Sequence, residues 1–344
     1  SDSTNWLGTP HTPSRGGLVC SLMRAAIYSQ HGPSSVMTVL EVTTPGPGPG
    51  EVRVRLETAG VNPTDFKVRS AGPSIPFDFQ VPCHDGAGVV EAVGPGVDPS
   101  RIGERVWVYL AAHQRQWGTA AQYTVVPARQ AVPLPEGISN EQAAGLGVPY
   151  LTAHACLFDG GKIDGATVLV AGGAGAVGHA AIELAVRAGA HVIATVSSAA
   201  KAAIAKAAGA HVVVNYTDAD AAAQIRAAAR AGVDRIIEVA LGANLSLDLD
   251  VIAPHGTIVT YASEATDPVL PTRALMNLNV TVRYVILYGF TPAMLAAGVA
   301  DITEALTGGA LSALPLHRFT LEQTAAAFDA VEANAVGKVI LDIE

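Results

Sequence analysis

The sequence predicts an α/β fold in which a doubly wound parallel sheet is inserted into a strand-rich, partly closed barrel. Three observations carry this prediction. A short apolar run from Thr167 to Val170 leads into a glycine-rich turn and a good helix former. Strands and helices alternate after that turn. Short strands joined by Gly and Pro turns precede it, in residues 24–147.

The first part of the chain reads as strands. The segment 51–59 alternates apolar and charged residues, which indicates a strand with one wet face. The run of alternating Pro and Gly at 45–50 before it is a turn. By the same criteria we expect strands at 25–28, 37–42, 51–59, 86–94, 105–109 and 121–126.

The second part alternates between strand and helix, as a doubly wound sheet requires. We expect strands near 166–172, 191–196, 211–215, 233–240, 256–261 and 280–287. We expect helices near 175–188, 199–208, 218–231, 243–252, 291–306 and 321–333, and a last strand at 337–343. The expected division is a disordered extension at 1–22, a strand-rich domain at 23–147 and 289–344, and a nucleotide-binding domain at 148–288.

Composition narrows the function. The chain of 344 residues is 49% apolar and carries a net charge of −9, which does not favour nucleic acid or anionic lipid as partners. Its three cysteines form no C-x-x-C pair, which suits a reducing cytoplasm. No apolar run reaches the length of a membrane span. Residues 1–22 lack the pattern of a secretory signal.

The glycine-rich turn predicts a dinucleotide site. A helix N-terminus offers free N–H groups to a pyrophosphate, and glycines let the backbone approach it. The spacing fits both G-x-G-x-x-G and the looser G-x-x-G-x-x-G. The alternative is an ordinary tight turn between strand and helix. The expected pyrophosphate-binding residues are Gly172, Gly173, Gly175, Ala176, Val177 and Gly178.

The strand at 191–196 predicts which dinucleotide is used. An acidic residue usually follows this strand where the ribose 2′-hydroxyl is free. The chain has no acid between Glu183 and Asp218, and instead offers Ser197, Ser198 and Lys201. Hydroxyls and an ammonium group suit a 2′-phosphate, so we expect NADPH. The alternative has Ser197 as a helix N-cap and Lys201 as a surface charge, and both roles can coexist.

Several segments together resemble the medium-chain dehydrogenase/reductase superfamily, and within it the zinc-free NADPH:quinone oxidoreductases, the ζ-crystallin-like group. The similar segments are 60–65 with 69–72, 82–94, 103–106, 171–178 and 337–341. This resemblance covers residues 24–344. It implies a Rossmann domain inserted in a GroES-like domain. Cys83, Ala71 and Glu104 depart from the family's Gly, Gly and Asp.

The resemblance also indicates whether the protein binds a catalytic metal. Zinc-dependent relatives place ligands at the positions that hold Asn62, His84 and Gly147 here. A catalytic zinc needs about three protein ligands, so we expect no metal. His84 and Cys83 then form a packed turn beneath the site. A quinone or a conjugated carbonyl spreads the incoming charge and needs only orientation and a modest hydrogen bond.

The resemblance implies roles for further residues. Asn62 and Asp65 lie beside the nicotinamide, although Asp65 could equally cap a helix. Tyr150 is a pocket wall or a core residue. The segment 114–120 is a rim of the substrate cleft or only a connecting loop. Expected cofactor contacts beyond the turn are Thr152, Ser197, Ser198, Lys201, Tyr216, Gly242, Tyr261, Ser263 and Lys338, the last with a solvated surface lysine as its alternative.

The leading functional hypothesis is an NADPH-dependent quinone reductase acting on a small molecule. The rivals are an NADPH-dependent enone or enoyl-thioester reductase and a non-catalytic NADPH-binding protein; the missing ligands disfavour an alcohol dehydrogenase. The apolar strand expected at 280–287 would lie at the sheet edge and could pair with its copy, so we expect a homodimer.

Overall fold

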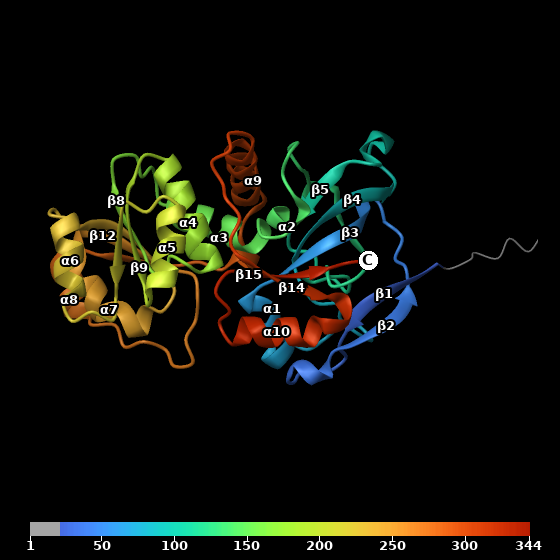
Figure 1. Ribbon diagram of the computed structural model, residues 1–344, viewed down its shortest axis with the longest axis horizontal. Helices are drawn as coiled ribbons and strands as arrows, with labels where there is room; N and C mark the ends of the chain where they lie inside the picture. Colours follow the sequence, from blue (N-terminus) through green and yellow to red (C-terminus); the bar gives the residue numbers. More distant parts are fainter. Residues whose placement is uncertain (1–20) are drawn as a thin grey trace, which may run out of the picture.

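The computed structural model describes residues 21–344. A parallel sheet with its helices forms one half of the molecule and the strand-rich part forms the other (Figure 1). Helix α3 (Gly147–Phe158) lies between the two halves. The extension expected at 1–22 falls outside the described residues up to position 20. Leu22 belongs to β1, so the first strand begins three residues before the strand expected at 25–28.

The parallel sheet has six strands in the order β10-β9-β8-β11-β12-β13. Every neighbouring pair is parallel, as the sequence predicts. The strands are β8 (Thr167–Val170), β9 (His191–Val196), β10 (Val212–Asn215), β11 (Val233–Glu238), β12 (Ile252–Thr260) and β13 (Thr281–Tyr284). The helices between them are α4 (Ala176–Arg187), α5 (Ala199–Ala207), α6 (Ala221–Ala228), α7 (Leu241–Val251) and α8 (Thr272–Leu278).

The strand-rich half contains a sheet in the order β14-β15-β3-β4-β5-β7, with β6 also paired to β3. All these pairs are antiparallel except β14 with β15. A hairpin of β1 (Leu22–Ile27) and β2 (Thr38–Thr43) forms a separate two-stranded sheet that shares the same hydrophobic core. The sheet strands are β3 (Glu51–Val61), β4 (Asp85–Val93), β5 (Arg105–Val108), β6 (Tyr123–Pro127), β7 (Ala131–Pro133), β14 (Leu316–Thr320) and β15 (Lys338–Asp342).

The remaining helices are α1 (Pro63–Ala71), α2 (Asn140–Ala143), α9 (Pro292–Thr307) and α10 (Thr324–Glu332). Helix α10 buries Phe328 in the core of the strand-rich half. Helix α9 instead buries Ile302 and Leu306 in a cluster with Leu151 and the apolar residues of β8. That cluster also contains Trp107 of the strand-rich half, so the domain boundary expected at 288/289 stays a prediction.

Three further details differ from the expected elements. Strand β13 is only four residues long, because its regular pairing with β12 ends at Tyr284 and a short 3-10 helix begins at Leu287. Strand β14 was not expected, since His317 and Arg318 make its sequence polar. Helix α8 was likewise missed. The edge position of β13 in the sheet is confirmed.

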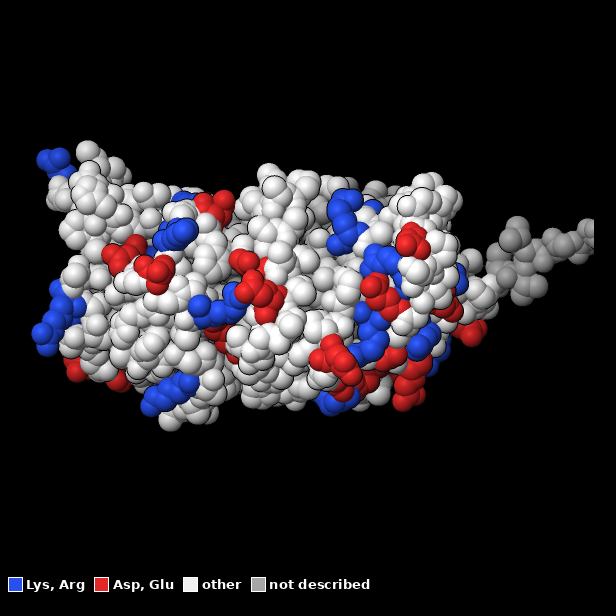
Figure 2. Space-filling model, turned by 90° about the horizontal axis from the view of Figure 1, so that it is seen from above, with Lys and Arg blue, Asp and Glu red and all other residues white. Residues whose placement is uncertain are grey.

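None of the helices formed by residues 21–344 is long and apolar enough to span a bilayer. On the face seen in Figure 2, Lys and Arg side chains are interspersed with Asp and Glu, and no continuous basic surface forms. This charge pattern agrees with the net charge of −9 in disfavouring a polyanionic partner.

Candidate functional site

The glycine-rich turn joins β8 to α4, and its glycines are sterically required. Gly172 has a φ of 66°. A Cβ on Gly178 would lie 2.2 Å from the carbonyl oxygen of Gly172, and one on Gly173 would lie 2.9 Å from the Cβ of Ala194. Gly175 occupies the N-cap position of α4 and no side chain caps the helix there. The turn thus leaves backbone N–H groups open for a phosphate, which fits a dinucleotide.

The expected 2′-phosphate residues lie together after β9 and β10. The Nζ of Lys201 donates to the Oγ of Ser197 at 2.9 Å. Ser198, rather than Ser197, is the N-cap of α5, since its Oγ accepts from the Lys201 N–H. The N–H of Tyr216 bonds the carbonyl of Val196, so its half-exposed ring lies beside the same strand end. The group offers an ammonium, hydroxyls and an aromatic face.

The start of α7 meets the loop after β12. A carboxyl group that sequence reasoning missed lies here: Glu264 accepts from the N–H groups of Gly242 and Ala243, at 2.5 and 3.2 Å. Tyr261 N–H donates to the carbonyl of Glu238. Burial raises the pKa of the Tyr261 phenol. Gly242 and Tyr261 are therefore at the carboxyl edge of the sheet, and Glu264 holds the helix start that the cofactor was expected to approach.

Asn62 is at the centre of a buried polar cluster between β3 and α1. Its Nδ2 donates to Asp85 Oδ2 at 2.7 Å, and its Oδ1 accepts from Lys338 Nζ at 2.6 Å. Its backbone N–H donates to Asp65 Oδ2 at 2.7 Å, so Asp65 does cap α1. The carboxyl of Asp85 also accepts from the N–H of Val148. Lys338 is only 4% exposed, which contradicts the solvated alternative for this lysine.

Burial shifts the pKa values in this cluster. Burial raises the pKa of the Asp85 carboxyl to about 6, against the opposing effect of Lys338. Burial also raises the pKa of Asp65, and the charge of Asp85 adds to that shift. The pKa of Lys338 is lowered by burial, while the two carboxyls oppose the change. Because one cation faces two carboxyls, the cluster is suited to sharing a proton.

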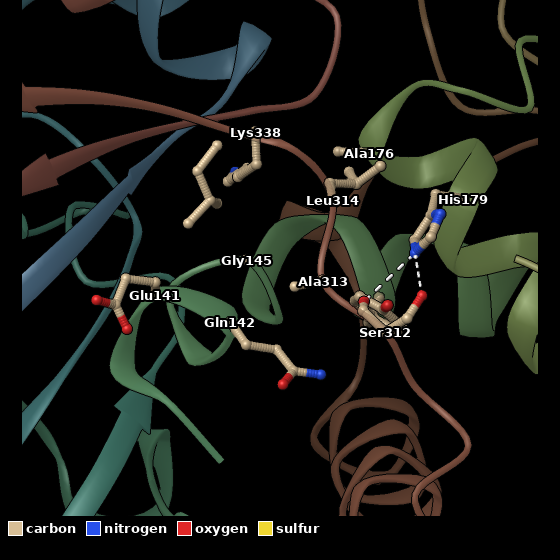
Figure 3. A pocket seen from close by; sticks show the side chains of 11 residues that line it. Glu141, Gln142, Gly145, Ala176, His179, Ser312, Ala313, Leu314 and Lys338 are labelled. Atoms are coloured by element: carbon tan, nitrogen blue, oxygen red, sulfur yellow. Dashed lines mark hydrogen bonds between the residues drawn. The ribbon is translucent and has the colours of Figure 1, made fainter. Parts of the chain in front are cut away.

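A cavity connects this cluster with the glycine-rich turn (Figure 3). Its wall includes Ala176 and His179 of α4, Tyr150 of α3, and Lys338 of β15. In Figure 3 the α4 residues lie across the cavity from Glu141 and Gln142. Thr152, two residues further along α3 than Tyr150, is buried and does not line this cavity.

Tyr150 is a wall of that cavity, but its hydroxyl is engaged. The Oη donates to Glu183 Oε2 at 2.6 Å, and burial followed by the Glu183 charge raises the pKa of the phenol well above its usual range. The other oxygen of Glu183 accepts from both the N–H and the Oγ of Ser312. Glu183 therefore joins α3, α4 and the segment before β14. Sequence reasoning did not find this contact, which links residues 129 positions apart.

A second, larger cavity of about 450 Å³ opens on the other side of Asp65. Its wall is mostly apolar, with Val68, Ile75 and Phe77 among the residues. Gln114 and Arg115 line it, so the segment 114–120 does reach a cavity wall. The polar residues in its wall include Asp65, His84, His113 and Tyr288. A concave apolar pocket with a few polar groups is the usual form of a small-molecule site.

The positions of the family's metal ligands are occupied in other ways. Both polar atoms of Asn62 are hydrogen-bonded within the protein. A Cβ on Gly147 would lie 2.1 Å from Asp85 Oδ1, so no ligand side chain fits there unless Asp85 moves. Within residues 21–344, no three His, Cys, Asp or Glu side chains are grouped so that they could hold a metal. Cys83 adopts a φ of 75°, the conformation that the family's glycine would supply.

Comparisons with known proteins agree with this architecture. Residues 48–136 match the family model of the alcohol dehydrogenase GroES-like domain, and residues 176–304 match that of zinc-binding dehydrogenases. The chain is 29% identical to the quinone oxidoreductase of Rattus norvegicus over 329 residues, which is 93% of this chain and 98% of that protein.

Solved structures extend the likeness. A mycobacterial protein complexed with NADPH has a TM-score of 0.81 and 30% identity, covering 93% of this chain and 99% of its own. An NAD-dependent alcohol dehydrogenase has a TM-score of 0.85 and 29% identity, covering 94% of this chain and 100% of its own. With both domain types matched, the chain is an oxidoreductase with a nicotinamide cofactor site and belongs to the medium-chain dehydrogenase/reductase superfamily.

Proposed function

We propose that this oxidoreductase is an NADPH-dependent, zinc-independent quinone oxidoreductase. One observation carries the proposal: the cavity at the glycine-rich turn reaches Lys338, whose Nζ holds Asn62 in a position where zinc-dependent relatives have a metal ligand. That cavity is small, about 20 Å³, so a dinucleotide bound at the N-terminus of α4 would pass beside it on the way to the Asn62 cluster. The likeness to the rat quinone oxidoreductase supports the choice of acceptor.

The residues for each part of the cofactor follow from the site. The pyrophosphate would lie on the N–H groups of Ala176 and Val177, and the 2′-phosphate beside Lys201 and Ser197. Near the nicotinamide we place Asn62, Asp65 and Thr152. The bound dinucleotide supplies a hydride. Lys338 supports NADPH binding by keeping Asn62 oriented, and Tyr150 supports it as a wall of the cavity.

The cavity of about 450 Å³ is our candidate for the acceptor site. It shares Asp65 with the Asn62 cluster, so an acceptor bound in it would lie next to the proposed nicotinamide position. The apolar wall excludes water, and a flat conjugated ring matches its Ile75 and Phe77 surfaces. A quinone needs no Lewis acid, because the charge that it gains spreads over the ring. Neither Asn62, which is hydrogen-bonded within the protein, nor Gly147, which has no side chain, can bind a metal as the family's ligands do. A site of this kind favours a quinone over a simple ketone.

Activity with a panel of acceptors tests the proposal. NADPH oxidation would be followed with benzoquinone, naphthoquinone, an enal and a trans-enoyl thioester, and NADP⁺ reduction would be followed with a primary alcohol. We expect turnover with the quinones, unchanged after dialysis against a chelator. Turnover of the enal or thioester alone would instead support the rival reductase. Tight NADPH binding without turnover of any acceptor would support a binding protein. Loss of quinone turnover on chelation would refute zinc independence.

Two further predictions belong with this function. A homodimer would form through the free edge of β13, and the cysteine pattern predicts a cytoplasmic location. Neither bears on the acceptor chemistry. The dimer is testable with purified protein and is taken up below.

A further inference from the structure

Three side chains at the acceptor cavity form a hydrogen-bonded chain that the proposed function does not yet use. The Oη of Tyr288 lies 2.9 Å from His84 Nε2 and 2.5 Å from Thr64 Oγ1. The ring of Tyr288 stacks on His113 with 4.7 Å between the ring centroids, which fixes its orientation. Tyr288 and His84 both line the cavity.

The protonation of His84 follows from its surroundings. Burial lowers the pKa of its imidazole to about 3, so the ring is neutral and carries one N–H. Nδ1 is buried and has no hydrogen-bond partner among the described residues, whereas Nε2 faces Tyr288. A buried N–H without a partner costs more than a bare lone pair, because only the N–H gives up a strong bond to water. We therefore place the proton on Nε2.

This assignment fixes the direction of the chain. With its proton on Nε2, His84 donates to the Tyr288 oxygen. The hydroxyl of Thr64 can donate to the same oxygen, which has two lone pairs. The phenolic hydrogen of Tyr288 is then free to point into the cavity. Burial raises the pKa of the Tyr288 phenol, and the hydrogen bond with Thr64 opposes that shift while the charges of Asp65 and Asp85 add to it. The two donors therefore act against burial when the phenol loses its proton, as donors do in an oxyanion site.

We propose that Tyr288 donates a proton to the carbonyl oxygen of the bound acceptor, and that His84 and Thr64 position its hydroxyl for that step. The inference rests on the proposed function. As hydride adds to the conjugated acceptor, negative charge collects on the carbonyl oxygen. The Tyr288 O–H bond breaks and its proton forms the new O–H bond of the product. The tyrosinate, held by His84 Nε2–H and the Thr64 hydroxyl, recovers a proton from water after the product leaves.

The test begins without cofactor. The probe is 4-nitrophenol, a phenol whose oxygen stands in for the charged acceptor oxygen, and calorimetry measures its affinity for the apo protein. We expect Tyr288→Phe to weaken its binding about tenfold or more, the usual effect of losing a hydrogen bond to a charged group. Tyr284→Phe makes the same change on an exposed tyrosine and should bind like the wild type. Equal affinity in all three proteins would overturn the proposal.

Turnover and NADPH affinity complete the test. Tyr288→Phe should lower the turnover of the best acceptor by about 100-fold or more, the usual range for a lost general acid, with unchanged NADPH affinity. Thr64→Val should lower it less, and Thr64→Ser should restore it because the hydroxyl returns. A Tyr288→Phe protein that folds and turns over like the wild type would refute the proposal.

The two proposals fail in different ways. If the wild type reduced none of the acceptors, the proposed function would be wrong, while the loss of probe affinity in Tyr288→Phe would still support Tyr288 as a donor to a bound oxygen. If the wild type reduced quinones and Tyr288→Phe did so equally well, only the role of Tyr288 would be wrong. Thr64→Val, which leaves the phenol in place, covers the case in which Tyr288→Phe does not fold.

Discussion

The ammonium group of Lys338 lies 2.6 Å from the amide oxygen of Asn62, and both side chains are buried. This contact places a buried cation against two buried carboxyls, since the charges of Asp85 and Asp65 oppose the effect of burial on the pKa of Lys338. A buried cation that neutralises carboxyls cannot be removed without leaving an uncompensated charge.

We therefore expect Lys338→Met to lower the free energy of unfolding by about 3 kcal/mol, measured by urea denaturation. Lys67→Met makes the same change on an exposed lysine and should stay within about 0.5 kcal/mol of the wild type. Adding Asp85→Asn to Lys338→Met should recover part of the loss, because it removes one of the two orphaned carboxyls. Equal stability of the two lysine variants would show that Lys338 does not compensate the cluster.

Cofactor preference depends on Lys201. Its Nζ is held near Ser197 at the end of β9, where an acid would select a free 2′-hydroxyl. We expect Lys201→Ala to raise the Kd for NADPH about tenfold, equivalent to the roughly 1.4 kcal/mol of one charged contact, and to leave the Kd for NADH unchanged. Lys206→Ala, one turn further along the same helix, is the matched control. A wild type that binds NADH more tightly than NADPH would contradict the prediction at once.

The next prediction concerns Tyr150, which lines the cavity beside α4, and asks whether its hydroxyl takes part in catalysis. Its hydroxyl is committed to Glu183, so Tyr150→Phe should leave quinone turnover within about threefold of the wild type. Stability should fall by about 1–2 kcal/mol, because the variant leaves a buried Glu183 oxygen without its donor. Thermal unfolding and steady-state kinetics on the same preparation measure both effects. A fall in turnover of 100-fold with normal cofactor affinity would instead assign Tyr150 to catalysis.

Local features of the site could be predicted from the sequence. The glycine spacing dictates a turn in which Gly178 must approach Gly172, and no tertiary context is needed to see it. The helix cap by Asp65 is equally local, since it lies three residues from Asn62. Ser197, Ser198 and Lys201 follow the apolar run at 191–196, which is recognisable as a buried strand from the sequence alone.

Features built from distant segments could not be predicted. Tyr288 meets His84 across 204 positions of sequence, and no motif marks either of them as a pair. Glu264 reaches Gly242 from a loop whose conformation the sequence does not determine. The extent of β13 was overestimated because Val285 to Leu287 are apolar, yet Ile286 is exposed and Leu287 is buried at the start of a short helix rather than in a strand. Pairing and burial of this kind depend on the whole fold.

The short edge strand still carries the dimer prediction. Strand β13 ends the sheet, and Tyr284 and Ile286 beside it are about two-thirds exposed. An apolar edge with unpaired backbone groups can join its own copy. We expect light scattering at micromolar protein to give twice the chain mass of 35.1 kDa. Ile286→Lys should shift the protein toward the monomer, and Leu22→Lys, an equally exposed apolar residue in the other half, should not. A monomeric wild type would contradict the dimer.

The last prediction concerns stability against pH and rests on a buried pair of carboxyls, Glu238 at the end of β11 and Asp248 on α7. Burial, followed by the charge of Glu238, raises the pKa of Asp248 to about 9, and Asp248 in its protonated form donates to Glu238. An unfolded Asp titrates near pH 3.8. Between these two values the native state holds a proton that the unfolded chain has lost, so the free energy of unfolding falls as pH rises.

Asp248→Asn removes this titration while keeping a donor to Glu238. We expect the variant to lose a dependence of up to about 1.4 kcal/mol per pH unit across the window from about pH 4 to pH 9, and to be more stable than the wild type at pH 8. Urea denaturation at several pH values measures both effects. Asp250→Asn, two residues along the same helix and exposed, should keep the slope of the wild type. If Asp248→Asn also kept that slope, Asp248 would be ionised in the folded protein, and the proton that we assign to the pair would be absent.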